Sequence, residues 1–508
     1  MKLTRRDALK ASGLALGGLA IGGADKALAQ CKVLAPCYPV SDIAETQEYS
    51  YFKQLKASAP LAPYTPLKDN EMRISFMGST IPMARRAQME MSIFVEVGPW
   101  IPGPNYNPTY DPLGQASDSF MFDLGTGSST NYTTMGIAFR KMDKLFATHL
   151  HADHIGDLTQ VYCFGPAGDR QSPMYVWGPG PSGVPIPGTA GRFYDDGTKA
   201  FCKNFREALR WNTESFGFEN TAYAWYRDHM PTKELWGTPC DLIPVGDDPP
   251  YDGFAVIPIE LNWTLEEGGI AYNNAQTMVK ITHFPVIHCR KGSIGYKLEW
   301  NGLSMIFTGD TKPEWLSVGQ GKGVDVFIHE MIVPPEVWAM KMMGLSLIPT
   351  GNKDFDRYVA NLSKVQNSSH SPQGAFGYLL SQIDPLPRLT VATHFPVSDD
   401  TVDCALNSVR AHIPDIGNLG EKIVWSFDTM VIRVFAGDPK PAIQQQVVSP
   451  ISDFCFSPFA ISHNDALTPK YHDASGAGDP YAQIDESTAI PQHENGPNPK
   501  DNWCSNGY

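Results

Sequence analysis

The feature that most constrains this chain is the run THLHADH at Thr148–His154. It places three histidines and one aspartate within six positions, although only 13 of the 508 residues are histidine. Imidazole and carboxylate groups are ligands that suit zinc, manganese or iron. The residues just before the run predict a short strand over 144–148, and side chains two apart on an extended segment point to the same side. We therefore expect His149 and His151 to face one metal, and Asp153 and His154 a second; a turn with exposed histidines is the alternative.

Two metal sites need more ligands than this run supplies, and three candidates lie downstream at the ends of apolar runs. His288 follows FPVI, Asp310 follows IFTG, and His394 follows TVAT. Loops at one edge of a sheet commonly collect functional groups. Taken singly, a lone histidine or a Gly-Asp turn is more often structural. Together with the histidine cluster, the three are predicted ligands.

The length of 508 residues allows two or three domains, or one large core that carries insertions. A hydrophobic fraction of 42% with 19% charged residues is that of a folded protein. Strand patterns, the last of them over 423–435, alternate with helical ones, which predicts an α/β fold of packed layers. The predicted division is an export signal (1–29), an N-terminal arm (30–71), a main domain (72–436) with an aromatic-rich insertion (165–253), and an irregular C-terminal tail (437–508).

The first 29 residues have the layout of a cleaved export signal. A twin arginine, Arg5-Arg6, precedes a mildly apolar run over 11–24 and a small-residue cleavage site that ends at Ala29. This arrangement is typical of the twin-arginine (Tat) route, although a basic tail would also fit. Elsewhere no apolar run approaches the roughly 20 residues of a membrane-spanning helix. We expect a periplasmic or secreted protein, cleaved after Ala29, without stable membrane insertion.

The net charge of the chain bears on its partners. It carries 40 lysines and arginines against 54 aspartates and glutamates, a formal charge of −14. A chain of this charge repels phosphate backbones at long range. We therefore expect no nucleic acid among its partners, unless a local basic patch overrides the overall charge.

In these motifs and their order, the chain resembles metallo-β-lactamase-fold hydrolases, and within them the branch of ribonuclease Z and the related metal-dependent arylsulfatases and phosphodiesterases. The resemblance covers roughly 72–160 and 255–435, and is specific for the fold and two metals but much less so for the substrate. It implies an αββα sandwich of two mixed sheets with helices outside. The matching segments are THLHADH (148–154), His288 with Gly295-Tyr296, FTGDT (307–311), FIHE (327–330), His370-Ser371 and ATHF (392–395).

The resemblance also implies a cofactor and a set of ligands. The cofactor is two divalent metal ions, zinc first, with manganese or iron as alternatives. Water bound to such an ion has its pKa lowered from 15.7 to about 7, which implies hydrolysis by metal-bound hydroxide. The implied ligands are His149, His151 and His288 for one ion, Asp153, His154 and His394 for the other, and Asp310 as a bridge between both.

Three residues are implied in catalysis. Asp153 would orient the attacking hydroxide while it binds its metal. Glu330 and His370 match a glutamate and a histidine that act near the scissile phosphate in ribonuclease Z. A protonated histidine can protonate a leaving oxygen, so this pair favours an ester of phosphate or sulfate. For Glu330 the alternative is a carboxylate that orients a ligand imidazole.

The chain departs from ribonuclease Z in ways that argue against RNA as its substrate. Those enzymes commonly carry a flexible tRNA-clamping arm between the positions that match His288 and Asp310, which are here only 22 positions apart (310 − 288). The export signal and the negative charge point the same way. The main hypothesis is therefore an exported binuclear metal-dependent hydrolase of a small ester: an aryl sulfate, a phosphodiester or a related compound.

Two alternative functions stay open. One keeps the metals but changes the bond to that of a lactone or an amide, such as an acyl-homoserine lactone or a β-lactam. The other is a non-catalytic metal-binding protein of the periplasm. The aromatic residues of 165–253 allow a substrate pocket, a homodimer interface or a small core of the insertion's own.

Overall fold

The computed structural model describes most of the chain between Thr65 and Val447. The described residues are 65–82, 88–98, 116–170, 172–218, 253–343, 345, 349–397, 399–437 and 442–447. The predicted export signal (1–29) lies outside them, as does most of the predicted arm (30–71).

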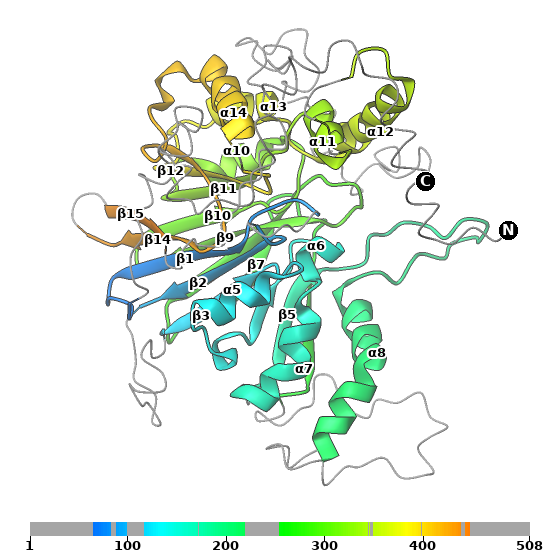
Figure 1. The fold of residues 1–508 in the computed structure, drawn as a ribbon. Coiled ribbons are helices and arrows are strands. Elements are labelled where there is room, and N and C mark those ends of the chain that lie inside the picture. Colours follow the sequence, from blue (N-terminus) through cyan, green and yellow to red (C-terminus); the bar gives the residue numbers. More distant parts are fainter. Residues whose placement is uncertain are drawn as a thin grey trace, which may run out of the picture.

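Two mixed β-sheets form the centre of the molecule (Figure 1). In the described part of the chain, the first sheet has eight strands in the order β15-β14-β1-β2-β3-β4-β5-β6. The strands from β15 to β3 pair antiparallel, and those from β3 to β6 pair parallel. Their bounds are β1 (Glu71–Gly78), β2 (Ser92–Val97), β3 (Asp118–Phe122), β4 (Lys144–Phe146), β5 (Met174–Pro179), β6 (Val256–Leu261), β14 (Met430–Phe435) and β15 (Ala442–Val447).

The second sheet has seven strands among the described residues, in the order β13-β12-β11-β10-β9-β8-β7. The strands from β10 to β13 pair parallel, and those from β7 to β10 pair antiparallel. Their bounds are β7 (Gly269–Asn274), β8 (Val279–Pro285), β9 (Ile294–Trp300), β10 (Leu303–Phe307), β11 (Val326–Glu330), β12 (Leu389–Thr393) and β13 (Ile423–Trp425).

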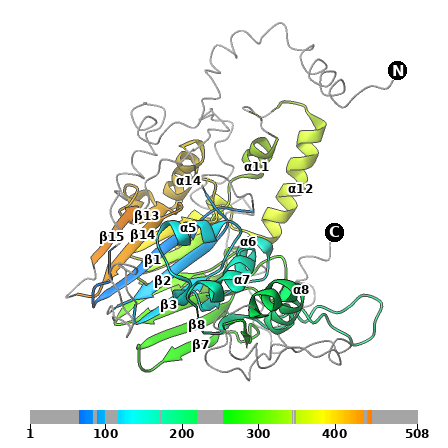
Figure 2. The same cartoon turned by 60° about the horizontal axis from the view of Figure 1, so that its bottom comes forward.

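Helices cover the outer face of each sheet, which confirms the predicted αββα layering. In Figure 1, α5, α7 and α8 lie below the eight-stranded sheet and α10 to α14 lie above the seven-stranded sheet; the turned view of Figure 2 brings α5 and α7 to the front. None of the helices in the described ranges has the length and apolarity that crossing a membrane requires. The α-helices are α5 (Ser128–Thr134), α6 (Ala152–Ile155), α7 (Leu158–Gly168), α8 (Thr198–Phe218), α10 (Trp315–Gly321), α11 (Pro335–Met342), α12 (Lys353–Ser369), α13 (Gln373–Ser381) and α14 (Asp399–His412).

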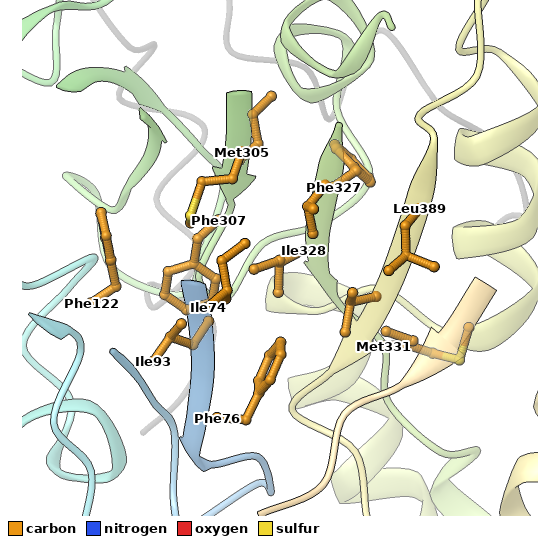
Figure 3. Packing of buried hydrophobic residues seen from close by; sticks show 14 of the residues in the cluster. Ile74, Phe76, Ile93, Phe122, Met305, Phe307, Phe327, Ile328, Met331 and Leu389 are labelled. Atoms are coloured by element: carbon orange, nitrogen blue, oxygen red, sulfur yellow. The ribbon is translucent and has the colours of Figure 1, made fainter. Parts of the chain in front are cut away.

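The largest apolar cluster fills the space between the two sheets. Strand β2 shows how alternation divides its side chains: Ile93 and Val95 belong to the cluster between the sheets, whereas Phe94 packs with the helices on the outer face. Figure 3 shows Ile74 and Ile93 of the first sheet opposite side chains of the second, such as Phe307. Burial of each such side chain contributes about 1.5–3 kcal/mol. This core holds the two sheets together, and with them the loops at their edges.

The range 165–253 is not an insertion throughout, contrary to the sequence-based division. Strand β5 lies between β4 and β6 in the first sheet. Its Trp177 stacks on Phe146 of β4, with ring centroids 4.5 Å apart, so this aromatic residue belongs to the main core. The sequence pattern does not predict this strand, because its six residues, MYVWGP, end in Gly-Pro. They also lie in a stretch rich in glycine and proline, which is typical of turns. Residues 219–252 lie outside the described part of the chain.

The predicted strand over 423–435 is two strands that belong to different sheets. β13 ends at Trp425 in the second sheet, and β14 begins at Met430 in the first. Between them Thr429 has a left-handed backbone with φ of 62°, which allows the sharp crossing. β14 then pairs with β15. The range 437–508, predicted as an irregular tail, therefore contains one strand of the first sheet.

Candidate metal centre

The predicted site residues lie where strands of both sheets end. Strands β10, β11 and β12 run parallel, so their carboxyl ends meet at one edge of the second sheet. β4 of the first sheet ends beside them, because the Nε2 atom of its His149 reaches the same cluster as residues of the second sheet. The site residues at these ends are His149 after β4, His288 after β8, Asp310 after β10, Glu330 as the last residue of β11, and His394 after β12.

The histidine run leaves β4 extended and then turns into the short helix α6. His151 is the residue before the helix and is still extended, with φ −72° and ψ 152°. Asp153 and His154 lie inside α6, so the run changes direction between its second and third histidines. Gly125 makes room for this turn, because a Cβ atom there would lie 2.1 Å from the backbone oxygen of Asp153. The change of direction lets one short run contribute to two ligand groups.

The first group consists of three imidazoles. The Nδ1 atom of His151 lies 2.9 Å from the Nε2 atom of His149 and 3.1 Å from the Nε2 atom of His288. Two nitrogens bound to a tetrahedral zinc ion, with bonds of about 2.0–2.1 Å, would be about 3.3 Å apart. The three ring nitrogens therefore converge on one point at nearly the spacing that a shared metal requires.

The second group consists of two carboxylates and two imidazoles: the candidate ligand atoms of Asp153, His154, Asp310 and His394 all lie within 4.8 Å of one another. The Oδ2 atom of Asp153 is 3.5 Å from Nε2 of His154 and 3.3 Å from Nε2 of His394. Asp310 places its Oδ1 atom 3.3 Å from Nε2 of His154 and its Oδ2 atom 3.9 Å from Nε2 of His288 in the first group. Asp310 thus lies between the two groups, in the position of a bridging ligand.

Glu330 and His370 extend the cluster beyond Asp310. The Nδ1 atom of His370 donates to the Oε2 atom of Glu330 at 2.9 Å and lies 3.8 Å from Oδ2 of Asp310. Burial alone would lower the pKa of His370, but the carboxylates of Glu330 and Asp310 raise it to about 9. In the chain without metal, His370 therefore favours its protonated form, next to the two ligand groups.

Asp123 is a site residue that the sequence analysis did not identify. It follows β3, is fully buried, and has a left-handed backbone with φ of 56°. Its Oδ2 atom accepts hydrogen bonds from Nδ1 of His154 at 2.6 Å and from the hydroxyl of Thr148 at 2.8 Å. That hydroxyl accepts in turn from Nδ1 of His149 at 3.1 Å. One carboxylate thus orients a histidine of each ligand group.

Burial and neighbouring charges set the ionisation of the ligands. Burial lowers the pKa of His149 and of His288 well below the usual 6.5, so both rings are neutral and keep a lone pair for a metal. Burial opposes ionisation of Asp153 and Asp310, but the nearby imidazoles of His154 and His394 hold the pKa of both carboxyls below its usual range. Both side chains are therefore carboxylates, the form that binds metals.

Two buried candidate ligand atoms at the centre of the cluster, which lie 3.3 Å from each other, make no hydrogen bond to any described residue. The buried Nε2 of His154 and Oδ1 of Asp310 have no hydrogen-bond partner among the described residues. Such atoms are rare unless an ion or a water completes them. Within the described chain, the ion pairs of Asp153, Asp310 and Glu330 are all with histidines, not with lysine or arginine. This donor set of imidazoles and carboxylates fits divalent cations of the zinc kind.

The structure brings all the predicted site residues into one cluster, while their roles as ligands and catalytic groups stay predictions. The alternative for Glu330 was a carboxylate that orients a ligand imidazole. Its Oε2 atom is 3.8 Å from Nδ1 of His394, too far for a hydrogen bond, so the contact needed to orient His394 is not made. A second residue that the sequence analysis did not place here is Cys289, whose Sγ atom lies 3.4 Å from Nε2 of His151. With Glu330 and His370 included, the candidate ligand atoms form three groups, of which the last two overlap: His149, His151 and His288; Asp153, His154, Asp310 and His394; and Asp310, Glu330, His370 and His394.

Comparison with known proteins relates the chain to ribonuclease Z. It is 30% identical to the ribonuclease Z of Treponema denticola over 82 residues, which are 16% of this chain and 27% of that protein. A longer match, 22% identical over 297 residues, is with the ribonuclease Z of Archaeoglobus fulgidus and covers 53% of this chain and 78% of that protein. The chain thus spans only about a quarter of the length of the first of these relatives. No protein-family model matches the chain.

Among solved structures, the chain is similar to the metallo-β-lactamase fold protein YhfI from Bacillus subtilis. The identity is 9% and the TM-score 0.41, over 72% of this chain and 100% of that one. A score this low adds nothing to the sequence matches. The relatives are named ribonuclease Z, which argues against the expectation that no nucleic acid is a partner of this chain. At identities of 22–30% the name does not decide the question.

Proposed function

Since the chain belongs to the metallo-β-lactamase superfamily, in its ribonuclease Z branch, we propose that it is an exported, binuclear metal-dependent hydrolase of a small phosphate or sulfate ester. The observation that carries the proposal is the placement of Asp310 between two ligand groups, with His370 3.8 Å from it and hydrogen-bonded to Glu330. An aryl sulfate or a phosphodiester suits such a site, because its non-bridging oxygens are negatively charged and bind cations and imidazolium groups.

Two divalent ions, held by the seven ligands, would lower the pKa of water to about 7 and offset the charge of the ester. The chain's own residues prepare the site. Asp123 fixes the ring of His154 directly and that of His149 through Thr148, so the ligand nitrogens are already oriented. Ligands placed in advance do not have to be ordered during the reaction.

Glu330 and His370 supply a proton beside the ligand groups. Glu330 is fully buried, and its carboxylate raises the pKa of His370 in the chain without metal. His370 is 8% exposed and lies beside Asp310, next to the point at which the ligand groups meet. From there its imidazolium can stabilise the developing negative charge of the leaving oxygen and donate a proton to it.

The test combines metal analysis with turnover on the purified protein without its signal. We expect two metal ions per chain and chelator-sensitive cleavage of nitrophenyl sulfate or bis-nitrophenyl phosphate, in preference to a lactone and a chromogenic β-lactam. His151→Ala should lose metal and turnover together. His283→Gln is the matched control, because His283 is buried nearby but contacts the backbone oxygen of Asn262 at 3.2 Å and belongs to none of the ligand groups. Failure to bind zinc, manganese or iron, or cleavage of the lactone or lactam alone, would refute the proposal.

RNA is the second candidate substrate, because the relatives are named ribonuclease Z. Between His288 and Asp310 the chain forms the hairpin of β9 and β10, which leaves no room there for a long clamping arm. A structured RNA should therefore bind weakly and stay intact. Cleavage of RNA, with binding that weakens steeply as salt rises, would replace the small ester by RNA as the substrate.

Export is part of the proposal and is supported by the Arg5-Arg6 sequence, which lies outside the described residues. A double substitution, Arg5→Lys with Arg6→Lys, keeps the charge but removes the pair that the twin-arginine route reads. Fractionation of cells should find the unaltered protein outside the cytoplasm and the substituted protein inside it. Retention of both in the cytoplasm would remove export from the proposal.

A further inference from the structure

The ring of His151 has an outer contact of an unusual kind. Its Nδ1 atom faces the ring nitrogens of His149 and His288, and its Nε2 atom points away from them. That Nε2 atom lies 3.4 Å from the Sγ atom of Cys289. A metal bound at Nδ1 leaves the ring proton on Nε2, so this nitrogen is a donor and the sulfur is its acceptor. The distance is normal for such a bond, because sulfur is larger than oxygen.

Other histidines of the centre use oxygen acceptors for the same purpose. His288 donates from Nδ1 to the backbone oxygen of Ser369 at 2.8 Å, and His154 donates from Nδ1 to Asp123 at 2.6 Å. Outer contacts of this kind fix the tautomer and the orientation of a ligand imidazole. The contact of His151 with Cys289 is equivalent in geometry and differs in its acceptor atom.

Cys289 is itself held in place by its neighbours in the chain. Two residues before it, Ile287 donates its backbone N–H to the hydroxyl of Thr311 at 3.1 Å and accepts from the backbone N–H of Lys312 at 2.7 Å. On the other side, the Nε atom of Arg290 donates to Asp196 at 2.8 Å. The sulfur is thus presented to His151 by a segment that is fixed on both sides.

We propose that Cys289 is a positioning residue of the metal centre: its Sγ atom accepts a hydrogen bond from Nε2–H of His151 and holds that ring with Nδ1 toward the first metal. This inference rests on the proposed function, since it requires a metal at the group of His149, His151 and His288. It makes the affinity for one of the two metals sensitive to chemical modification of a thiol, which an oxygen acceptor would not do.

The experiment measures zinc affinity by competition with a chromogenic chelator, on the full chain without its signal. Cys289→Ala removes the acceptor and should weaken one of the two zinc sites about 10- to 100-fold, the usual effect of losing an outer contact. Cys289→Ser keeps an acceptor and should restore the affinity to within about threefold. Cys163→Ala is the control, because Cys163 is buried in α7 within the outer apolar cluster and should leave both zinc sites unchanged.

A second measurement separates positioning from a general effect on folding. The ring N–H of His151 in the zinc-loaded protein should exchange slowly with solvent in the wild type and in Cys289→Ser, and faster in Cys289→Ala. The thermal midpoint of the metal-free protein should be the same in all three. A lower midpoint of Cys289→Ala without metal, with unchanged exchange, would reduce Cys289 to a packing residue.

A thiol acceptor can also be blocked chemically. Iodoacetamide transfers its carbamoylmethyl group to Sγ, with loss of iodide and of the thiol proton, and should weaken the same zinc site in the wild type but not in Cys289→Ser. Equal zinc affinity in the wild type and Cys289→Ala would overturn this inference and leave the proposed function intact. A wild type that binds no metal would overturn both.

Discussion

Two buried clusters of charge in this molecule balance their carboxylates in opposite ways. At the start of β1, the carboxylate of Glu71 is fully buried and forms two ion pairs. The Nε atom of Arg73 lies 2.8 Å from it, and the Nε atom of Arg433, on the neighbouring β14, lies 2.7 Å from it. At the metal centre, the buried Asp153, Asp310 and Glu330 have only imidazoles as their ion-pair partners within the described chain. The first cluster is neutralised by guanidinium groups, and the second by imidazoles, which can also bind a metal.

The difference separates a structural cluster from a functional one. A guanidinium group stays protonated and is no metal ligand, whereas an imidazole loses its proton when it binds a metal. The Glu71 cluster is therefore complete as soon as the chain has folded, and each of its members depends on the others. Substitutions in the metal centre should remove metal and turnover, whereas substitutions in the Glu71 cluster should lower stability alone.

The largest expected effect is the loss of turnover in Asp310→Asn. The amide removes the charge that the two metals of the proposed centre would share, so turnover should fall about 1000-fold or more, which corresponds to about 4 kcal/mol. Metal content should fall with it. The metal-free protein should also lose some stability, because the imidazoles of His394 and His154, which hold the pKa of the Asp310 carboxyl low, lose their partner. Steady-state kinetics, metal analysis and urea unfolding check the three points, with the exposed Asp354→Asn as the control.

Glu71→Gln should lower the free energy of unfolding without loss of metal or turnover. It leaves Arg73, which is only 2% exposed, without its carboxylate, and the free energy of unfolding should fall by about 3–5 kcal/mol. Metal content and turnover of the folded protein should stay at wild-type values. Urea unfolding measures the change, and Glu299→Gln, a half-exposed carboxylate on β9, should stay within about 0.5 kcal/mol of the wild type. A Glu71→Gln protein of unchanged stability would contradict the comparison.

Zinc should stabilise one cluster and leave the other unaffected. At a free zinc concentration 100 times the dissociation constant, each site adds about 2.7 kcal/mol to the free energy of unfolding. Glu71→Gln should gain as much as the wild type on zinc addition, whereas Asp310→Asn should gain less. Thermal unfolding with and without a chelator measures both increments. An equal gain in Asp310→Asn would show that zinc binds elsewhere.

The smallest effect concerns pH. Burial would raise the pKa of Glu71, but Arg433 and Arg73 outweigh it and lower the pKa below 4.5. The folded state therefore binds a proton less readily than the unfolded state. The resulting stability is fully present above pH 4.5 and is lost as the pH falls through the folded-state pKa. Urea unfolding of the metal-free protein should show this acid-side loss in the wild type, and the Glu71 contribution should be absent in Glu71→Gln.

The sequence was informative where function depends on neighbours in the chain. The run THLHADH predicts a site because its ligands lie on one strand-to-helix turn, whose geometry follows from local sequence. The strand patterns of residues 72–77, 92–97 and 295–300 likewise predict β1, β2 and β9 closely. The pattern fails for β15, which lies in a polar stretch and is a strand because β14 offers it an unpaired edge. It fails again for β13 and β14, which pair with strands of two different sheets.

By itself, the sequence determined which residues bring metal-binding chemistry, and the order of the strands that carry them. Only the tertiary structure decided how these residues are oriented. Asp123 and His154 are 31 positions apart, Cys289 and His151 are 138 apart, and His370 and Glu330 are 40 apart. No local pattern encodes such pairs, because their contacts form only when the core between the sheets brings two sets of strand ends to the same edge.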